Sequence, residues 1–383
     1  MIAVTANYRM ALDLVPVCRR EDDFIAYTTI VNLEHNRNLH DPDRAVHPQD
    51  GCTGNRPRQR CALQRIRNRP AGSSERNELV GFMKWYLGIN EAGTHNELGL
   101  HARIAVSSAL SRTDLEPRLL YTGARNAFTE WMEARGVMVI DVEIRFEKEI
   151  NFLAAQGLYP KALLGHWLRS QICLLEMGDE FVVYTDCDVL FVEQPDFGHI
   201  HPEYFACAPE FKVDNWNYCN TGVMIINVPS LRRTYPEFQE FVLCGMRQGR
   251  GHMFNDQAAY NELYRRRWER LDPSFNWKPY WGINEAAPII HFHGPKLDTI
   301  RAILDGQWDW TSEYGRQLGS LLCSSLPGYE CAIRALLDCA QRDLPEKLRM
   351  LQKLVEDLAR EPVPIPADQI DLSFMNFRYF ADD

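Results

Sequence analysis

Phe181-Val-Val-Tyr-Thr-Asp186-Cys-Asp188-Val-Leu-Phe191 is an apolar stretch that two acidic residues interrupt. Its β-branched, aliphatic and aromatic residues are typical of a buried parallel strand and its continuation. Ligands of α/β sheets bind beyond the carboxyl ends of the strands, so we expect Asp186 and Asp188 to face a binding site. Carboxylate oxygens suit Mg²⁺ or Mn²⁺, which in turn bind phosphates. Isolated acid pairs of this spacing also occur in turns, where they cap a helix or bind water.

The composition is typical of a globular protein. The chain has 383 residues, of which 45% are hydrophobic and 25% charged, and this predicts one large domain or two. The formal net charge of −10 argues against a general binder of nucleic acid or anionic membranes. The eleven cysteines form no CxxC pair, so neither a zinc site nor a disulfide scaffold is indicated, and we expect a reducing, cytoplasmic location. The chain contains no apolar run of the roughly 18 residues expected for a membrane span, and we predict none.

Three regions differ in their patterns. Residues 1–76 include the segment 36–76, which carries nine Arg among Pro, Gly, Gln, Asn and Ser. Because so few apolar residues cannot offset the entropy cost of ordering, we expect a poorly ordered N-terminal extension, with one possible strand at 24–31. A basic arm for nucleic acid or acidic lipid is the alternative.

Residues 77–310 alternate between strand and helix patterns, which predicts an α/β domain with a mostly parallel sheet flanked by helices. The expected strands are 79–90, 119–121, 137–142, 181–186 with a continuation at 189–191, 204–209, 220–227 and 289–296. The expected helices are 98–110, 125–135, 161–176, 229–243 and 258–267. Residues 311–383 form a predicted helical extension and tail, with helices at 313–324, 330–341 and 346–360.

Four further polar groups accompany the acid pair along the chain. Arg169 lies on the predicted helix before the central strand, and Asn220 begins a later strand. Asp256 and Gln257 open a helix, and His291-Phe-His-Gly-Pro-Lys296 ends the last predicted strand. Taken singly, such residues are also found as surface arginines, turn asparagines, or acids opposite a helix dipole.

Taken in order, these motifs resemble the GT-A-fold glycosyltransferases of family eight, the glycogenin and bacterial lipopolysaccharide galactosyltransferase group. The similarity covers roughly Leu79 to Lys296. It implies a GT-A, Rossmann-like fold and a hexosyltransferase. In that family the matching acids and the first His of the last motif bind Mn²⁺ (or Mg²⁺), which implies a metal site of Asp186, Asp188 and His291.

The resemblance also implies how the donor is bound. Lys296 is expected to contact the diphosphate, and Arg169 the donor and the loop that holds the acids. Gly294 precedes that Lys in the family motif, and Asn90 ends the stretch that binds the nucleotide. UDP-sugar is the favoured donor, but the base stays open because Gly88-Ile-Asn90-Glu91 stands where the family typically has an Asp and an Asn.

The same family assigns the catalytic groups. It implies that Asn220 touches donor sugar and acceptor, and that Asp256 and Gln257 face the donor sugar, with Gln257 near the anomeric carbon. The family transfers sugar with retention at that carbon. The stretch Glu210–Tyr218 is our candidate acceptor loop because it mixes polar and aromatic residues; the acceptor itself, a glycan, a lipid-linked sugar or a protein, is not predicted.

Chemistry argues in the same direction without the family. A divalent cation and Lys296 would stabilise the charge that develops on a departing diphosphate. The imidazole of His291 suits Mn²⁺, but His293 lies on the same strand face and is a competing ligand. Either His could instead be a hydrogen-bonded core residue.

Three classes of function therefore remain. The first is a metal-dependent, retaining glycosyltransferase. The second is a sugar nucleotidyltransferase, which is expected to carry a Gly-rich basic loop after its first strand, whereas residues 91–97 are neither. The third is a non-catalytic nucleotide-sugar-binding protein of the same fold. Asp214 and Glu210 are the only acids of the candidate acceptor loop that could serve as the general base of an inverting enzyme.

Overall fold

The computed structural model describes residues 83–156, 159, 161–250, 255–360 and 366–376. The predicted extension 1–76 and its possible strand lie outside these residues. No helix among the described residues is long and apolar enough to cross a membrane.

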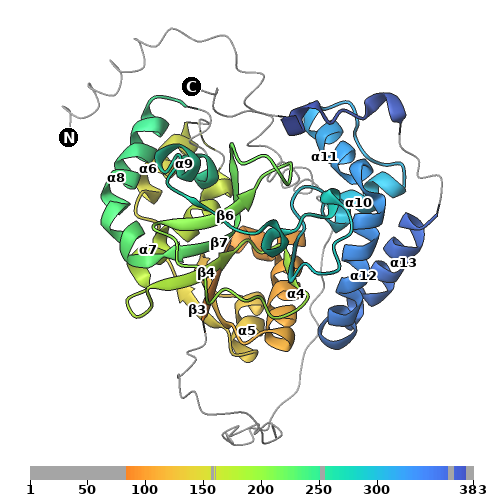
Figure 1. Cartoon of the computed structure of the whole chain (residues 1–383), viewed down its shortest axis with the longest axis horizontal. Helices are drawn as coiled ribbons and strands as arrows, with labels where there is room; N and C mark the ends of the chain where they lie inside the picture. Colours follow the sequence, from red (N-terminus) through yellow and green to blue (C-terminus); the bar gives the residue numbers. More distant parts are fainter. Residues whose placement is uncertain (1–82, 157–158, 160, 251–254, 361–365, 377–383) are drawn as a thin grey trace, which may run out of the picture. The chain divides into compact units, whose positions relative to one another are not determined.

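A mostly parallel sheet organises the chain, as predicted (Figure 1). In the part that the structure describes, seven strands follow the order β3-β2-β1-β4-β7-β6-β8. The pairs β3-β2, β2-β1, β1-β4 and β6-β8 are parallel, and β7 is antiparallel to its neighbours β4 and β6. These strands are β1 (Lys84–Asn90), β2 (Glu116–Thr122), β3 (Met138–Asp141), β4 (Phe181–Thr185), β6 (Phe205–Pro209), β7 (Cys219–Asn227) and β8 (Glu269–Arg270).

A second, two-stranded sheet lies next to the acid pair. It joins β5 (Val189–Phe191) to β9 (Ile289–His291) in antiparallel register. Every residue of both strands is buried, which fits their wholly apolar or aromatic composition apart from His291. The strand that was predicted to end at the acid pair is β4, and its predicted continuation is β5, which pairs in this second sheet.

Helices cover the sheet on both faces. Before the acid pair they are α3 (Glu91–Thr94), α4 (Glu97–Arg112), α5 (Ala127–Ala134), α6 (Glu147–Ala155), the 3₁₀ helix η2 (Lys161–Gln171) and α7 (Ile172–Leu175). After it they are α8 (Val228–Arg247), α9 (Asp256–Leu263), η4 (Pro273–Asn276), η5 (Pro279–Trp281), α10 (Leu297–Leu304), α11 (Glu313–Ser324), α12 (Leu326–Asp343), α13 (Pro345–Leu358), η6 (Ala367–Gln369) and η7 (Ser373–Asn376).

Alternating residues of the strands supply two different cores. Tyr86 and Tyr184 pack with Trp167 and the aromatic side of α8 and α9, whereas Trp85 and Val183 pack with α4 and α5. A third core holds the C-terminal helices: apolar residues of α11, α12 and α13 pack with Phe292 and other residues around β9. Figure 1 shows α12 and α13 side by side.

One expected helix has a different form. Residues 161–176 were expected to form a single helix, but the chain winds as the 3₁₀ helix η2 and then as α7. This segment lies very close to β1, since a Cβ added at Gly88 would be 3.1 Å from the Cβ of Leu168, and one added at Gly165 would be 3.4 Å from Cγ of Asn90. Gly165 also lowers the α-helical propensity of the segment. Helices α6 and α10 were not predicted.

Candidate metal and donor-binding site

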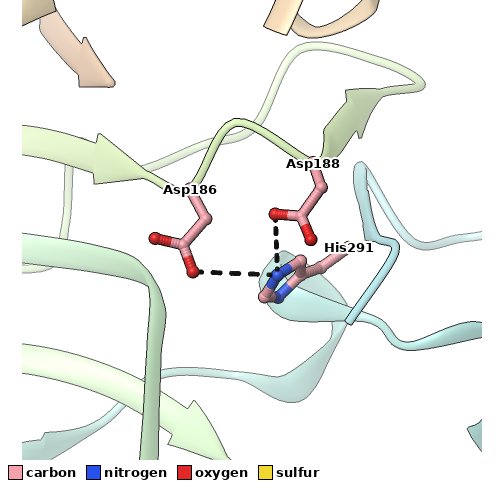
Figure 2. Close-up of side chains that lie close together, drawn as sticks. All are labelled: Asp186, Asp188 and His291. Carbon is pink, nitrogen blue, oxygen red and sulfur yellow. Dashed lines mark ion pairs between the residues drawn. The ribbon is translucent and has the colours of Figure 1, made fainter. Parts of the chain in front are cut away.

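Strand pairing brings His291 to the two acids. Asp186 and Asp188 lie between β4 and β5, and β5 pairs with β9 so that Val189 is opposite His291. The backbone NH of Phe292 also donates to the carbonyl of Asp188 at 2.8 Å. Figure 2 shows the result: the three side chains converge from the loop between β4 and β5 and from β9.

The convergence is tight enough for one metal ion. Nε2 of His291 lies 3.3 Å from Oδ1 of Asp188 and 3.9 Å from Oδ2 of Asp186. One ligand atom from each residue lies within 4.8 Å of the other two. Two carboxylates and one imidazole form a donor set that suits Mn²⁺, so the residues fit the predicted ion.

The imidazole of His291 is fixed by its other nitrogen. His291 is buried, and Nδ1 lies 2.8 Å from Oδ1 of Asn276. Burial lowers the pKa of His291, although Asp188 opposes the shift. A neutral ring that donates through Nδ1 points the lone pair of Nε2 toward the carboxylates, where it is free to bind a cation.

Gly222 on β7 makes room for this ring. A Cβ added at Gly222 would lie 2.2 Å from Cε1 of His291, a distance that no side chain could tolerate. The glycine of the Asn220-Thr-Gly motif is therefore required by the close approach of the imidazole.

Lys296 holds the opposite side of Asp188. Its Nζ lies 2.5 Å from Oδ2 of Asp188 and donates to the carbonyl of Phe292 at 3.1 Å. Burial would raise the pKa of Asp188, but Lys296 and His291 outweigh burial and hold it well below its usual value. Gly294 has φ of +86°, and a Cβ there would be 2.8 Å from Leu321, so this glycine is required by the turn that leads to Lys296.

Arg169 connects the acid pair to the neighbouring elements. Its guanidinium lies 3.1 Å from Oδ1 of Asp186, pairs with Oδ2 of Asp256 and donates to the carbonyl of Thr221. Burial raises the pKa of Asp256 to about 7, and Arg169 opposes that shift. One guanidinium thus supports two carboxylates, and Asp256 is too deeply buried to meet a ligand in this conformation.

Gln257 is oriented by β7. Its Oε1 accepts hydrogen bonds from the backbone NH of Thr221 at 2.9 Å and from the Thr221 hydroxyl at 3.2 Å. Because a backbone NH can only donate, Oε1 must face Thr221, which leaves Nε2 as the part of this half-buried amide directed elsewhere. Asn220, by contrast, is only 2% exposed and donates through Nδ2 to Oε2 of Glu210 at 2.7 Å.

His293 contacts Glu210 and Tyr280, not the acid pair Asp186 and Asp188. Its Nε2 lies 3.1 Å from Oε1 of Glu210, and its Nδ1 lies 2.9 Å from the hydroxyl of Tyr280. Burial would raise the pKa of Glu210, but His293, Lys278 and Asn220 lower it to about 2. Of the two histidines in the motif, His291 is the one that the structure brings to Asp186 and Asp188.

Asn90 lies at the same end of the sheet as the acid pair. It ends β1, which runs parallel to β4 with Tyr86 opposite Tyr184, and its side chain accepts from the backbone NH of Gly93 at 2.9 Å. The loop of the acids reaches β1 through Cys187, whose Sγ is 3.2 Å from the carbonyl of Gly88.

Two supporting residues were not predicted from the sequence. Asn276 holds His291, and Lys278, which is fully buried, donates to the carbonyl of Pro209 at 2.7 Å. Burial lowers the pKa of Lys278 to about 7, and Glu210 opposes the shift. Both lie in the stretch 271–281, which we expected to be a loop, and an aromatic, Pro-broken loop offers no periodicity that would reveal their direction.

Comparisons with known proteins gave structural matches only. No protein-family model matches the chain, and no curated protein matches it. The apo form of glycosyltransferase GlyE from Streptococcus pneumoniae TIGR4 is 15% identical with a TM-score of 0.41, and the match covers 55% of this chain and 54% of GlyE, about half its length. Mouse xyloside xylosyltransferase 1, also 15% identical with a TM-score of 0.41, is matched over 56% of this chain and 99% of its own. The galactosyltransferase LgtC in complex with donor and acceptor sugar analogs is 16% identical with a TM-score of 0.45, and the match covers 63% of this chain and 96% of that chain.

Proposed function

We propose that this chain is a metal-dependent glycosyltransferase that moves a sugar from a nucleoside diphosphate-sugar to an acceptor hydroxyl, with retention of anomeric configuration. The observation that carries the proposal is the convergence of three acceptors, Asp186, Asp188 and Nε2 of His291, at the end of a buried strand. Acceptors this close together repel one another unless a cation or a proton lies between them, and two carboxylates beside an imidazole are a donor set that suits a divalent cation.

One cation beside this centre can meet an anionic ligand. Lys296 contacts the outer oxygen of Asp188 and its side chain is 18% exposed, whereas the buried Arg169 is already paired with Asp186 and Asp256. A diphosphate that bridges a metal ion and Lys296 would match this charge pattern, because it needs positive partners on more than one oxygen.

Each residue of the site has its own role in the proposed transfer. Asp186, Asp188 and His291 would hold Mn²⁺ or Mg²⁺, which when bound acts as a Lewis acid on the diphosphate. Lys296 stabilises the negative charge that the leaving diphosphate gains. Gln257 presents Nε2, a hydrogen-bond donor, to the sugar or its leaving oxygen, since its Oε1 is held by Thr221.

Retention is supported by the burial and low pKa of Glu210, one of the two acids of the candidate acceptor loop. An inverting enzyme needs a carboxylate that can reach the acceptor hydroxyl and take its proton. Glu210 is 8% exposed, is paired with His293 and has a pKa of about 2, so it is a poor base. Asp214 is exposed and stays the alternative base. In the retaining reaction the leaving phosphate accepts the proton of the acceptor hydroxyl on the same face of the sugar.

The donor and acceptor are also part of the proposal. We favour a UDP-sugar, with Asn90 at the end of β1 on the nucleotide side, and an acceptor, whether a glycan, a lipid-linked sugar or a protein, that meets the loop Glu210–Tyr218.

The proposal is tested by ligand binding to the full chain. Nucleoside diphosphate-sugars should raise the melting temperature in the presence of Mn²⁺ and much less in the presence of EDTA. Asp188→Ala should remove the Mn²⁺-dependent part, and Asp196→Asn, at an acid whose side chain is 87% exposed, should retain it. Equal stabilisation of Asp188→Ala and the unaltered chain contradicts the metal site. Turnover of a sugar phosphate with a nucleoside triphosphate, without sugar transfer, would favour the nucleotidyltransferase instead.

A further inference from the structure

A buried line of four side chains ends at the metal-facing histidine. Glu210, Asn220, Asn276 and His291 are between 0% and 8% exposed. Successive members are hydrogen-bonded at 2.7, 2.9 and 2.8 Å. The line joins the candidate acceptor loop, β7, η4 and β9, which are distant in the sequence.

The ionised carboxylate of Glu210, at one end of the line, determines how the amide of Asn220 is oriented. With a pKa of about 2, Glu210 is ionised near neutral pH and can only accept, so Asn220 must turn Nδ2 toward it. Oδ1 of Asn220 then faces the other way. The backbone NH of Gly222 lies 3.0 Å from this oxygen and can only donate, which independently requires the same orientation.

The orientation of Asn220 determines that of Asn276, and Asn276 in turn determines which nitrogen of His291 carries a hydrogen. Oδ1 of Asn220 accepts from Nδ2 of Asn276, so Asn276 presents Oδ1 to His291. An amide oxygen only accepts, and Nδ1 of His291 must therefore carry a hydrogen. In a neutral ring the single hydrogen is then used, and Nε2 keeps its lone pair.

We propose that Asn276 is a positioning residue that holds His291 in the Nδ1–H tautomer, with Nε2 ready to bind a divalent cation, and that Glu210 and Asn220 set the orientation of the Asn276 amide. The proposal rests on the metal site proposed above. With the amide of Asn276 reversed, its NH₂ would face Nδ1 and favour the other tautomer. The hydrogen of Nε2 would then point at Oδ1 of Asp188, 3.3 Å away, and occupy the position that the cation needs.

The tautomer can be measured without any metal or substrate. Long-range ¹H–¹⁵N NMR of the metal-free full chain, labelled at histidine and kept at about pH 8, distinguishes the two neutral forms, and the His291→Gln variant assigns the signal. The expected result is a protonated Nδ1 and an unprotonated Nε2. A signal from the Nε2–H form contradicts the proposal. Because the tautomer is measured in the unaltered chain, this test does not depend on whether a variant of Asn276 folds.

Metal affinity gives the second measurement. Asn276→Leu, which has no acceptor for Nδ1–H, should bind Mn²⁺ about 10- to 100-fold more weakly in calorimetry without donor. Asn276→Asp keeps an acceptor for Nδ1–H and should bind Mn²⁺ more tightly than Asn276→Leu. Asn151→Leu on α6 is the matched control and should leave the affinity unchanged. Equal Mn²⁺ affinity of Asn276→Leu and the unaltered chain contradicts the proposal. Absence of sugar transfer would contradict only the proposed function, because neither measurement uses a sugar donor.

Discussion

Nζ of Lys296 lies 2.5 Å from Oδ2 of Asp188, the carboxylate oxygen that does not face His291. Asp188 therefore lies between Lys296 and His291, and both lower the pKa of its carboxyl group. Lys296 is also the N-cap residue of α10: its carbonyl accepts from the backbone NH of Ile300 at 2.9 Å, and its side chain makes no capping hydrogen bond. The lysine is thus placed either to neutralise Asp188 or to meet an anionic ligand at the same strand end.

The first prediction concerns Lys296→Ala. We expect binding of a nucleoside diphosphate-sugar in the presence of Mn²⁺ to weaken about 10- to 100-fold, because one charge-assisted hydrogen bond is lost. Binding of Mn²⁺ alone should not weaken, since the lysine competes with the metal for Asp188. Calorimetry with metal alone and with metal plus donor separates the two effects. Loss of Mn²⁺ affinity equal to the loss of donor affinity would show that Lys296 instead supports the metal site.

The second prediction concerns Gln257. Gln257→Ala should lower kcat roughly tenfold or more and leave the Kd of the donor almost unchanged, as expected for an interaction made mainly in the transition state. Gln257→Glu tests which end of the amide acts, because it keeps an oxygen for Thr221 and replaces the donating Nε2. We expect this variant to be as impaired as Gln257→Ala. A fully active Gln257→Glu would mean that residue 257 acts only through its hydrogen bonds to Thr221 of β7.

The third prediction concerns Gly222→Ala. The new methyl group would lie 2.2 Å from Cε1 of His291 and must displace the ring. We expect Mn²⁺ affinity to fall about tenfold or more, and overpacking to cost about 1–3 kcal/mol in unfolding free energy. Gly198→Ala is the control, since its Cβ would be 3.6 Å from the nearest side-chain atom. An unchanged Mn²⁺ affinity in Gly222→Ala would remove His291 from the ligand set.

The fourth prediction concerns stability and pH at Glu176, outside the site. Burial would raise the pKa of Glu176, but hydrogen bonds from Lys84, Tyr86 and two backbone NH groups lower it to about 2 from 4.5. The unfolded chain therefore binds the proton first as the pH falls, so this contribution, about 3 kcal/mol, is complete above pH 4.5 and is lost toward pH 2.

Urea unfolding of Glu176→Gln and the unaltered chain, measured at several pH values, checks this prediction. The difference in unfolding free energy should be largest near neutral pH and should shrink steadily below pH 4.5. A difference that does not vary with pH would show that the carboxylate charge contributes nothing.

The sequence indicated which residues form the candidate site because the main ones directly adjoin buried strands. Asp186 and His291 each follow an apolar run, and such runs are local features that a pattern can reveal. The pairing of β5 with β9, which makes the residues neighbours, is a long-range contact and was not predicted. The mostly parallel sheet followed from the alternation of strands and helices and is confirmed.

Residues that act through tertiary contacts could not be predicted. Asn276 is one polar residue in an irregular segment, and only the folded chain places it between Asn220 and His291. The helix expected at 161–176 is present, but most of it winds as the 3₁₀ helix η2, a form that was not predicted. The close approach of η2 to β1 is again a tertiary contact.

The most direct test of retaining, metal-dependent transfer is the reaction of the full chain with an α-linked UDP-sugar and Mn²⁺, with water as the acceptor, followed by ¹H NMR from the first minutes. We expect release of UDP that stops when EDTA is added or when Asp188 is replaced by Ala, together with an early free sugar whose anomeric coupling is that of the α-anomer. A β-anomer as the early product, abolished by Asp214→Asn, would contradict retention, and metal-independent turnover would contradict the site built from Asp186, Asp188 and His291.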